Sequence, residues 1–182
     1  EKALFETVGE NGERLNTPDG RFINPGHSME TAWFMMQEAI ERRDKKIMER
    51  SMEVLLWSLE RGWDKETGGI FYFVDVENKP VMSLEWDMKL WWPQCEAMIA
   101  ARLAYLHFKE EKYNDVYLQL KEYCEKYFCD DECGEWYGYL HYDNTVSTTL
   151  KGNIFKGPFH IPRLYMIMAS MDETNGITEY MK

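Results

Sequence analysis

The sequence repeats one pattern of turn, glycine and aromatic residues, first in segment 64–71 and again in segment 129–136. The same offset separates Pro93 from Pro158, and nearly the same offset separates Pro25 from Pro93. Proline is tolerated in the first turn of a helix, so these positions mark three helix starts. A repeated pair of helices buries its apolar faces only against its neighbours. The repeat therefore predicts helical pairs stacked around an axis, which form a toroid of inner and outer helices.

Apolar residues at helical spacing predict five helices, and aromatic or β-branched runs predict short strands between them. The expected helices span residues 25–43, 45–61, 93–109, 113–128 and 158–170, and the expected strands span residues 4–8, 70–74 and 136–140. The order is helix, helix, hairpin, helix, helix, hairpin, helix. The prediction is an all-α fold with short β-hairpins between the helices, built as one domain over residues 1–182.

Charge and hydropathy exclude several classes of protein. Asp and Glu outnumber Lys and Arg by 32 to 21, which gives a net charge of -11 and argues against a nucleic-acid binder. No apolar run approaches the roughly 18 residues of a membrane span, and no signal segment opens the chain. The four cysteines match no zinc spacing and are expected to be free thiols. We therefore expect a cytoplasmic protein with no membrane contact and no metal site.

The three prolines also align three chemically useful side chains. His27, Cys95 and His160 each lie two residues after one of them. Inner helices of a toroid begin at one end, so the repeat predicts that these three side chains share a rim and face one cleft.

His27 and His160 each have a charged residue three positions further along the chain. This spacing places the histidine and its charged neighbour on the same helical face. Glu30 follows His27, and Arg163 follows His160. A helix N-terminus disfavours the protonated imidazole, whereas a neighbouring carboxylate favours it. Two imidazoles could thus differ in protonation and act as acid and base. The alternative is that each histidine only hydrogen-bonds the backbone of its loop.

A tryptophan-rich segment, residues 83–96, precedes the third predicted helix. It contains Glu85, Trp91 and Trp92 among other aromatic and charged residues. It can be read as a wall on which a sugar stacks beside hydrogen-bonding carboxylates, or as a loop whose rings cover the core. No nucleophile elbow, phosphate-binding glycine loop or HExxH motif is present.

Five stretches of the sequence resemble the N-acylglucosamine 2-epimerase family, in the family's order and spacing. They are NPGHSMETAWF (24–34), GWDKETGGIFYF (62–73), LEWDMKLWWPQCEAMIA (84–100), GEWYGYL (134–140) and KGPFHIPR (156–163). The resemblance implies an (α/α)6 toroid and interconversion of sugars epimeric at carbon 2, such as N-acetylglucosamine and N-acetylmannosamine. It implies that the chemistry requires no metal or cofactor and that ATP can act as an effector.

The resemblance also implies roles for individual residues. His27 and His160 match the acid/base pair, Glu30 matches the carboxylate beside the first histidine, and Trp91 or Trp92 matches an aromatic beside the sugar. We include Glu85 and Arg163 as further candidates for substrate binding.

The resemblance covers only the C-terminal half of the family's toroid. The chain is therefore expected to pair with a second copy as a homodimer, or to belong with an N-terminal half in a longer protein. Three other functions stay open: a non-catalytic half-barrel that dimerises, a glycan-binding module, and an aldose–ketose isomerase.

Overall fold

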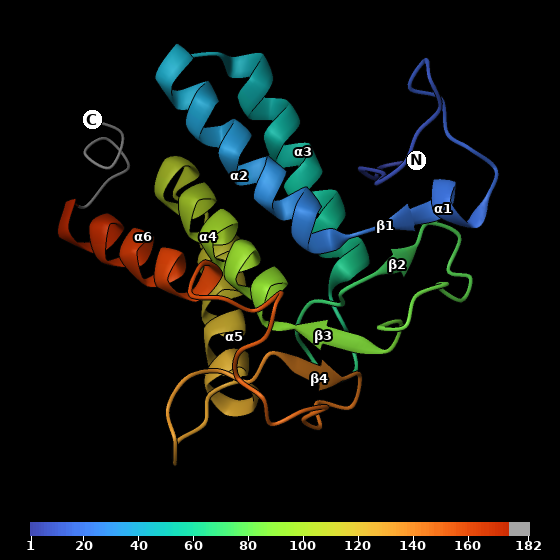
Figure 1. Ribbon diagram of the computed structural model, residues 1–182. Helices are drawn as coiled ribbons and strands as arrows, with labels where there is room; N and C mark the ends of the chain where they lie inside the picture. The colour runs from blue at the N-terminus through green and yellow to red at the C-terminus, as the bar shows by residue number, and fades with distance from the viewer. Residues whose placement is uncertain (175–182) are drawn as a thin grey trace.

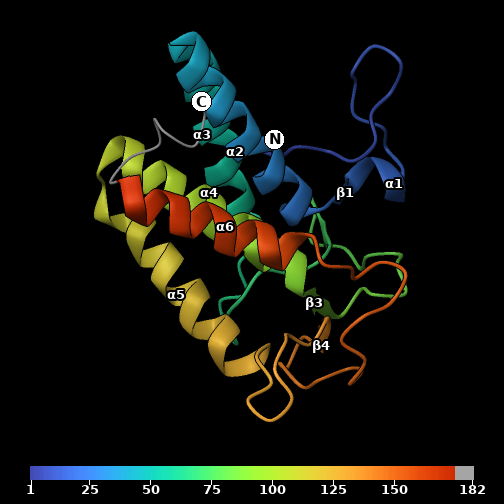
Figure 2. The same ribbon diagram turned by 60° about the vertical axis from the view of Figure 1, so that its left-hand side comes forward.

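A computed structural model describes residues 1–174 of the chain and shows paired inner and outer helices. The inner helices are α2 (Pro25–Arg42), α4 (Trp91–Phe108) and α6 (His160–Thr174), and the outer ones are α3 (Lys45–Gly62) and α5 (Glu111–Tyr127). Helix α2 packs on α3, α4 packs on α5, and α4 lies between α2 and α6. Figure 1 shows the first pair beside α4, and Figure 2 shows α6 lying along α4. The predicted all-α arrangement is confirmed as part of a toroid.

Local sequence explains where α2 and α3 begin and end. Asn24 caps α2 by accepting a hydrogen bond from the His27 backbone at 3.1 Å. Asp44 caps α3 in the same way, with Lys46 N at 2.9 Å. Between them Arg43 adopts a left-handed conformation with φ of 54°, which reverses the chain. The long segment 25–61 thus becomes two antiparallel helices.

Helix α4 is the centre of the core. Thirteen of its residues are buried, because α2, α5 and α6 cover it from different sides. A helix that is apolar all round is typical of such a position. None of the described helices is long and apolar enough to cross a membrane.

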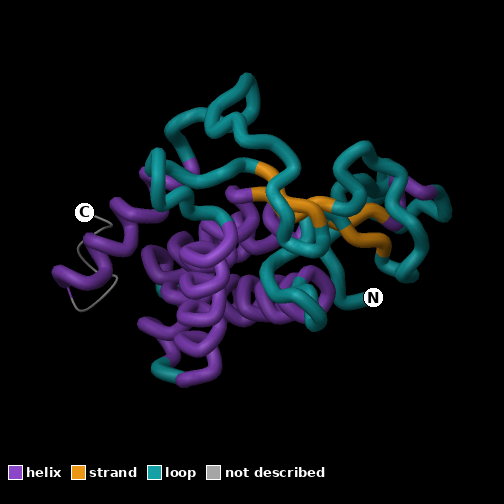
Figure 3. The backbone as a smooth tube through the Cα atoms, turned by 90° about the horizontal axis from the view of Figure 1, so that it is seen from below, coloured by secondary structure: helices purple, strands orange, loops and turns teal. Residues whose placement is uncertain are grey.

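Two short antiparallel sheets lie at the ends of the helical pairs where the inner helices α2 and α4 begin. β1 (Phe22–Ile23) precedes α2 and pairs antiparallel with β2 (Val74–Asp75), which follows α3. β3 (Met88–Leu90) precedes α4 and pairs with β4 (Tyr139–His141), which follows α5. The strands and long loops lie to one side of the helices (Figure 3). Each strand pair therefore fixes where an inner helix begins.

Several predicted boundaries are wrong. The predicted hairpins are present as tight antiparallel turns, with bridges Trp63↔Ile70 and Cys129↔Trp136, but residues 71–73 and 137–138 are irregular. Residues 4–8 form a loop instead of a strand, and the prediction missed the short helix α1 (Pro18–Arg21), which Thr17 caps and Pro18 begins. β-Propensity marks residues that suit a sheet, but a strand also needs a partner in register.

Two inner helices do not begin at the predicted prolines. α4 begins two residues before Pro93, where Trp91 N bonds Gly138 O at 3.1 Å. α6 begins two residues after Pro158, and Pro162 lies in its first turn instead. Proline fits anywhere in a first turn, because the N–H groups there have no helical partner. A proline therefore locates a helix start only approximately.

A buried lysine joins the two repeats below the inner helices. The Nζ atom of Lys89 lies 2.7 Å from Asp64 Oδ2, 2.6 Å from Thr67 Oγ1, and 3.0 Å from both Tyr142 O and Asn144 Oδ1. Tyr123 donates to the same Asn144 oxygen at 2.7 Å. The turn after α3 and the loop after β4 are thus tied together through one ammonium group.

Candidate active site

The starts of α2, α4 and α6 meet at one pocket of about 450 Å³. Its volume falls within the range of small-molecule sites. The pocket is lined by residues from all three inner helices and from the loops before them: His27, Glu30, Tyr72, Glu85, Leu90, Trp91, Trp92, Tyr139, Phe155, Phe159 and His160. The predicted meeting of helix starts at one cleft is confirmed.

The Trp92 indole lies in contact with both histidine rings. Its ring centroid lies 4.9 Å from that of His27 and 5.5 Å from that of His160, with the rings tilted by 34° and 33°. Trp92 is 7% exposed, so α2, α4 and α6 hold it in place. One indole therefore contacts both imidazoles, which come from α2 and α6.

The His27 imidazole is tied to a carboxylate outside its helix. Its Nδ1 lies 2.9 Å from Glu6 Oε2. This hydrogen bond raises the pKa of His27 above its ordinary value, burial opposes the rise, and the charges of Glu6 and Glu30 add to it. The side chain is 52% exposed, so the ring is open to the pocket.

The His160 imidazole is tied to a buried carboxylate. Its Nδ1 lies 2.8 Å from Glu96 Oε1, and the Glu96 side chain is fully buried. Glu96 also accepts a hydrogen bond from Trp33 Nε1 at 2.8 Å and one from Arg163 Nη2 at 2.6 Å. Three donors satisfy this carboxylate, which is how a buried charge is tolerated.

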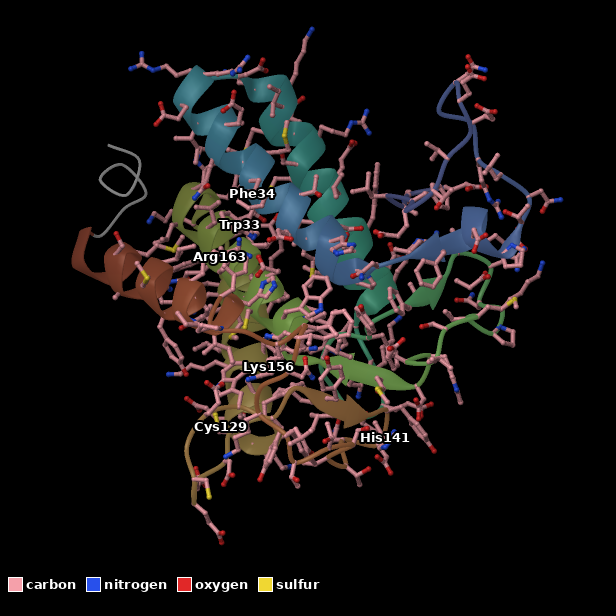
Figure 4. All side chains as sticks on the ribbon, in the orientation of Figure 1. Trp33, Phe34, Cys129, His141, Lys156 and Arg163 are labelled. Atoms are coloured by element: carbon pink, nitrogen blue, oxygen red, sulfur yellow. The ribbon has the colours of Figure 1, made fainter. Side chains whose placement is uncertain are left out.

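Arg163 links the two sides of the pocket. Its Nη2 donates to Glu30 Oε1 and to Glu96 Oε1, each at 2.6 Å. Its guanidinium lies beside Trp33 of α2, with 5.3 Å to that ring centroid (Figure 4). Arg163 also lies 4.5 Å from the Phe159 ring. These contacts fix the first turn of α6 against α2.

The same cluster is the place where a cation could bind. Ligand atoms of Glu30, Glu96 and His160 lie within 4.8 Å of one another. Arg163 Nη2 lies at hydrogen-bond distance from both carboxylates, so its positive charge occupies the position between them. These carboxylates fit a guanidinium partner, and the arrangement gives no reason to add a metal.

Two phenols and a carboxylate also line the pocket. Tyr72 and Tyr139 lie there with Glu85, which Ser83 Oγ contacts at 2.9 Å. Burial, followed by the charge of Glu85, raises the pKa of Tyr72 to about 12. The Tyr72 hydroxyl is therefore a protonated donor at neutral pH.

The structure brings most of the predicted residues together and separates one of them. His27, Glu30, Glu85, Trp91, Trp92 and His160 line the pocket, and Arg163 contacts two acids of the cluster. Cys95, predicted on the same rim, is fully buried, and burial raises its pKa well above the ordinary value. That prediction is wrong, because Cys95 is the fifth residue of α4 and lies in the core.

Sequence reasoning missed several residues of the site. Glu96 could have been noticed as the one acid of α4, a helix rich in apolar residues. Glu6 carries no local signal, since its contact spans 21 residues. The aromatics missed are Tyr72, Tyr139, Phe155 and Phe159.

Comparisons with known proteins agree with this architecture. The family model described as N-acylglucosamine 2-epimerase (GlcNAc 2-epimerase) matches residues 6–160. The N-acylglucosamine 2-epimerase of Bos taurus is 43% identical over 171 residues, which cover 93% of this chain and 40% of that protein. The human protein of the same name is 39% identical over 171 residues, with the same coverage. The chain thus spans about 40% of the length of these relatives.

Solved structures show the same fold. A cellobiose 2-epimerase from Bacillus thermoamylovorans B4167 superposes with a TM-score of 0.77 at 20% identity, over 93% of this chain and 42% of that chain. A D-mannose isomerase superposes with a TM-score of 0.73 at 24% identity, over 81% and 37% of the two chains. These likenesses confirm the predicted (α/α)6 toroid fold, of which this chain forms about half.

Proposed function

The chain belongs to the N-acylglucosamine 2-epimerase family, and we propose that its pocket epimerises a sugar at carbon 2, with His27 and His160 as the acid/base pair. The substrate class would be an open-chain aldose such as N-acetylglucosamine or N-acetylmannosamine. The single observation that carries the proposal is the pair of imidazoles on one indole, each within 5.5 Å of Trp92 between ring centroids.

The hydrogen bonds of the two imidazoles support this use. Each ring engages a carboxylate through Nδ1, Glu6 for His27 and Glu96 for His160. In the neutral ring, a hydrogen on Nδ1 that bonds a carboxylate leaves the Nε2 lone pair free. Each histidine can then take or give a proton at Nε2, on the side away from its carboxylate.

The reaction needs two such groups. The open-chain aldehyde makes the hydrogen on carbon 2 acidic enough to remove. One imidazole would take this proton from one face and leave an enolate, and the other, as an imidazolium, would return a proton to the opposite face. A single base would tend to restore the starting stereochemistry. Each proton transfer is worth about 10²–10⁴ in rate.

The enolate oxygen also needs a donor. The Tyr72 hydroxyl lines the pocket and, with a pKa raised to about 12 by burial, keeps its proton at neutral pH. A protonated phenol can stabilise charge that develops on oxygen during the reaction. Trp91 and Trp92 would offer ring faces to the sugar, Glu85 would accept from its hydroxyls, and Glu30 and Arg163 would complete the polar side.

The test is hydrogen exchange at carbon 2 in heavy water. We expect His27→Ala and His160→Ala each to lose epimerisation by at least about 10²-fold. Each variant keeps one base, so it should still exchange the hydrogen of the one isomer that presents its C–H to that base. His107→Ala is the control, since His107 lies in the last turn of α4 outside the pocket.

Other outcomes of the same assay separate the alternatives. Full epimerisation by either histidine variant contradicts the acid/base pair. Sugar binding without exchange in the wild-type chain indicates a glycan-binding module, and a ketose product indicates an aldose–ketose isomerase.

Further expectations from the family concern the parent protein. We propose that residues 1–182 form the C-terminal part of a longer toroid or act as a homodimer, in the cytoplasm, with no metal or cofactor required. ATP as an effector stays a prediction. Sedimentation of the chain tests for the dimer, and thermal unfolding with and without ATP tests for the effector, because a ligand of the folded state raises the melting temperature.

A further inference from the structure

Glu6 lies in the N-terminal loop, before the first element of the toroid. Its backbone N–H donates to Phe22 O at 3.3 Å, which fixes the loop beside β1. From there its carboxylate reaches His27 Nδ1 at 2.9 Å. The Glu6 side chain is 28% exposed, so water reaches it only in part.

The two histidines of the pocket therefore have different carboxylate partners. Glu96, the partner of His160, is fully buried and is shared with Trp33 and Arg163. Among residues 1–174, the ion pair of Glu6 is the one with His27. The full charge of Glu6 is thus directed at one imidazole, whereas that of Glu96 is divided among three donors.

We propose that Glu6 is the positioning residue of His27: its carboxylate holds the hydrogen on Nδ1, points Nε2 at the sugar, and makes His27 the imidazole that starts the cycle protonated. This inference rests on the proposed function. For the sugar isomer whose carbon-2 hydrogen faces His160, it assigns the role of first base to His160 and that of first proton donor to His27.

The charges around His27 support this assignment. Glu6 faces it from the N-terminal loop and Glu30 from its own helix, and both favour the protonated ring. Arg163 offsets Glu30 through its 2.6 Å hydrogen bond, and the neighbour from α4 is the uncharged Trp92. The N-terminus of α2 opposes protonation. Glu6 is thus the one carboxylate in direct contact with this imidazole in the described chain.

The experiment compares Glu6→Gln, Glu6→Asp and Glu6→Ala with the control Glu10→Gln. Glu10 is an exposed acid of the same loop. Nitrogen-15 NMR of the imidazoles gives the tautomer and the titration midpoint of each histidine in the chain itself, whether or not it turns over sugar. The pH profile of kcat is measured on the same samples.

We expect Glu6→Gln to lower the titration midpoint of His27 and leave that of His160 in place, because the amide keeps the acceptor but removes the charge. Glu6→Ala should also lose the Nδ1–H tautomer, and Glu6→Asp should restore part of both. kcat should fall by at least about tenfold in Glu6→Gln. The limb of the kcat pH profile that reports the acid should shift to lower pH, as the His27 midpoint does.

Each failure has its own signature. An unchanged His27 midpoint and tautomer in Glu6→Gln overturns the positioning role. A shifted midpoint with an unchanged kcat profile shows a structural ion pair and also overturns it. A wild-type chain that exchanges no carbon-2 hydrogen at any pH counts against the proposed function, while the NMR arm still decides whether Glu6 sets the state of His27.

Discussion

Replacing Lys89 by methionine should destabilise the chain more than any exposed substitution. The Lys89 side chain is fully buried, and its Nζ lies within 3.0 Å of four oxygens, those of Asp64, Thr67, Tyr142 and Asn144. Burial lowers the pKa of Lys89, but only an ammonium group offers three hydrogens to so many acceptors. Methionine keeps the apolar stem and removes all of these bonds.

The magnitude follows from what remains around Asp64. Loss of one partner of a buried ion pair costs about 3–5 kcal/mol. Asp64 keeps hydrogen bonds from Glu66 N, Thr67 N and Thr67 Oγ1, at 2.9, 3.3 and 2.6 Å, so the lower end of this range applies. We expect a loss of about 3 kcal/mol in the free energy of unfolding at pH 7. With a urea m-value of about 2 kcal/mol/M, the midpoint would fall by about 1.5 M.

The pH dependence gives a second test of the same reasoning. Burial alone would raise the pKa of Asp64, but hydrogen bonds from Lys89 and Thr67 hold it below its ordinary value. A depressed carboxyl pKa stabilises the folded state above the unfolded pKa, and this contribution is lost as pH falls through the folded pKa. The difference between wild type and Lys89→Met should therefore shrink in acid.

Urea unfolding followed by circular dichroism measures both effects, with Lys65→Met as the matched control. Lys65 is an exposed residue of the same turn, and its loss should change stability by less than about 0.5 kcal/mol. A Lys89→Met variant that is no less stable at pH 7 than this control would refute the reasoning.

Two further predictions concern the pocket. Gly26→Ala would place a Cβ 2.6 Å from Trp92 Cζ3, so it should displace the indole and cost about 1–3 kcal/mol, while Gly157→Ala, with no atom within 4 Å, should be neutral by thermal unfolding. A displaced indole also predicts reduced epimerisation in Gly26→Ala, and unchanged turnover would contradict the role of Trp92. The pKa of His27 is raised by its hydrogen bond to Glu6, so wild type should be more stable than Glu6→Gln below the unfolded pKa of about 6.5 and lose this advantage as pH rises through the folded pKa. Chemical denaturation at a series of pH values measures this, and an advantage that grows with pH would contradict it.

The helices of this chain are predictable because their signals are local. Asn24 and Asp44 cap α2 and α3 through contacts within three residues, and the apolar positions between them follow the helical period. The strands are harder to locate, because β1 pairs with a segment that lies beyond both α2 and α3, at Phe22↔Asp75. Aromatic content marks a residue that suits a sheet but does not identify its partner.

The candidate site divides in the same way. His27, Trp92 and His160 stand at helix starts, which the repeat locates, and their convergence follows from the toroid. Glu6 and Arg163 act through contacts that span 21 and 133 residues, to His27 and Glu30. The spacing from His160 within one helix singles out Arg163, whereas its short contacts cross to Glu30 and Glu96 on other helices. Helical spacing identifies the residue and gives no information on its partners.

The failure at Cys95 shows why the repeat could not complete the site. His160, His27 and Cys95 are the first, third and fifth residues of α6, α2 and α4. In α4 the pocket is lined by Trp91 and Trp92, and Cys95, about one turn further along, is fully buried in the core. The repeat locates the start of each inner helix to within about one turn. The direction in which a side chain points changes within a fraction of a turn, so the repeat alone does not say which side chains reach the pocket. The two histidines still contact one indole, and each has its carboxylate partner in a different place, Glu6 in the N-terminal loop for His27 and Glu96 in α4 for His160.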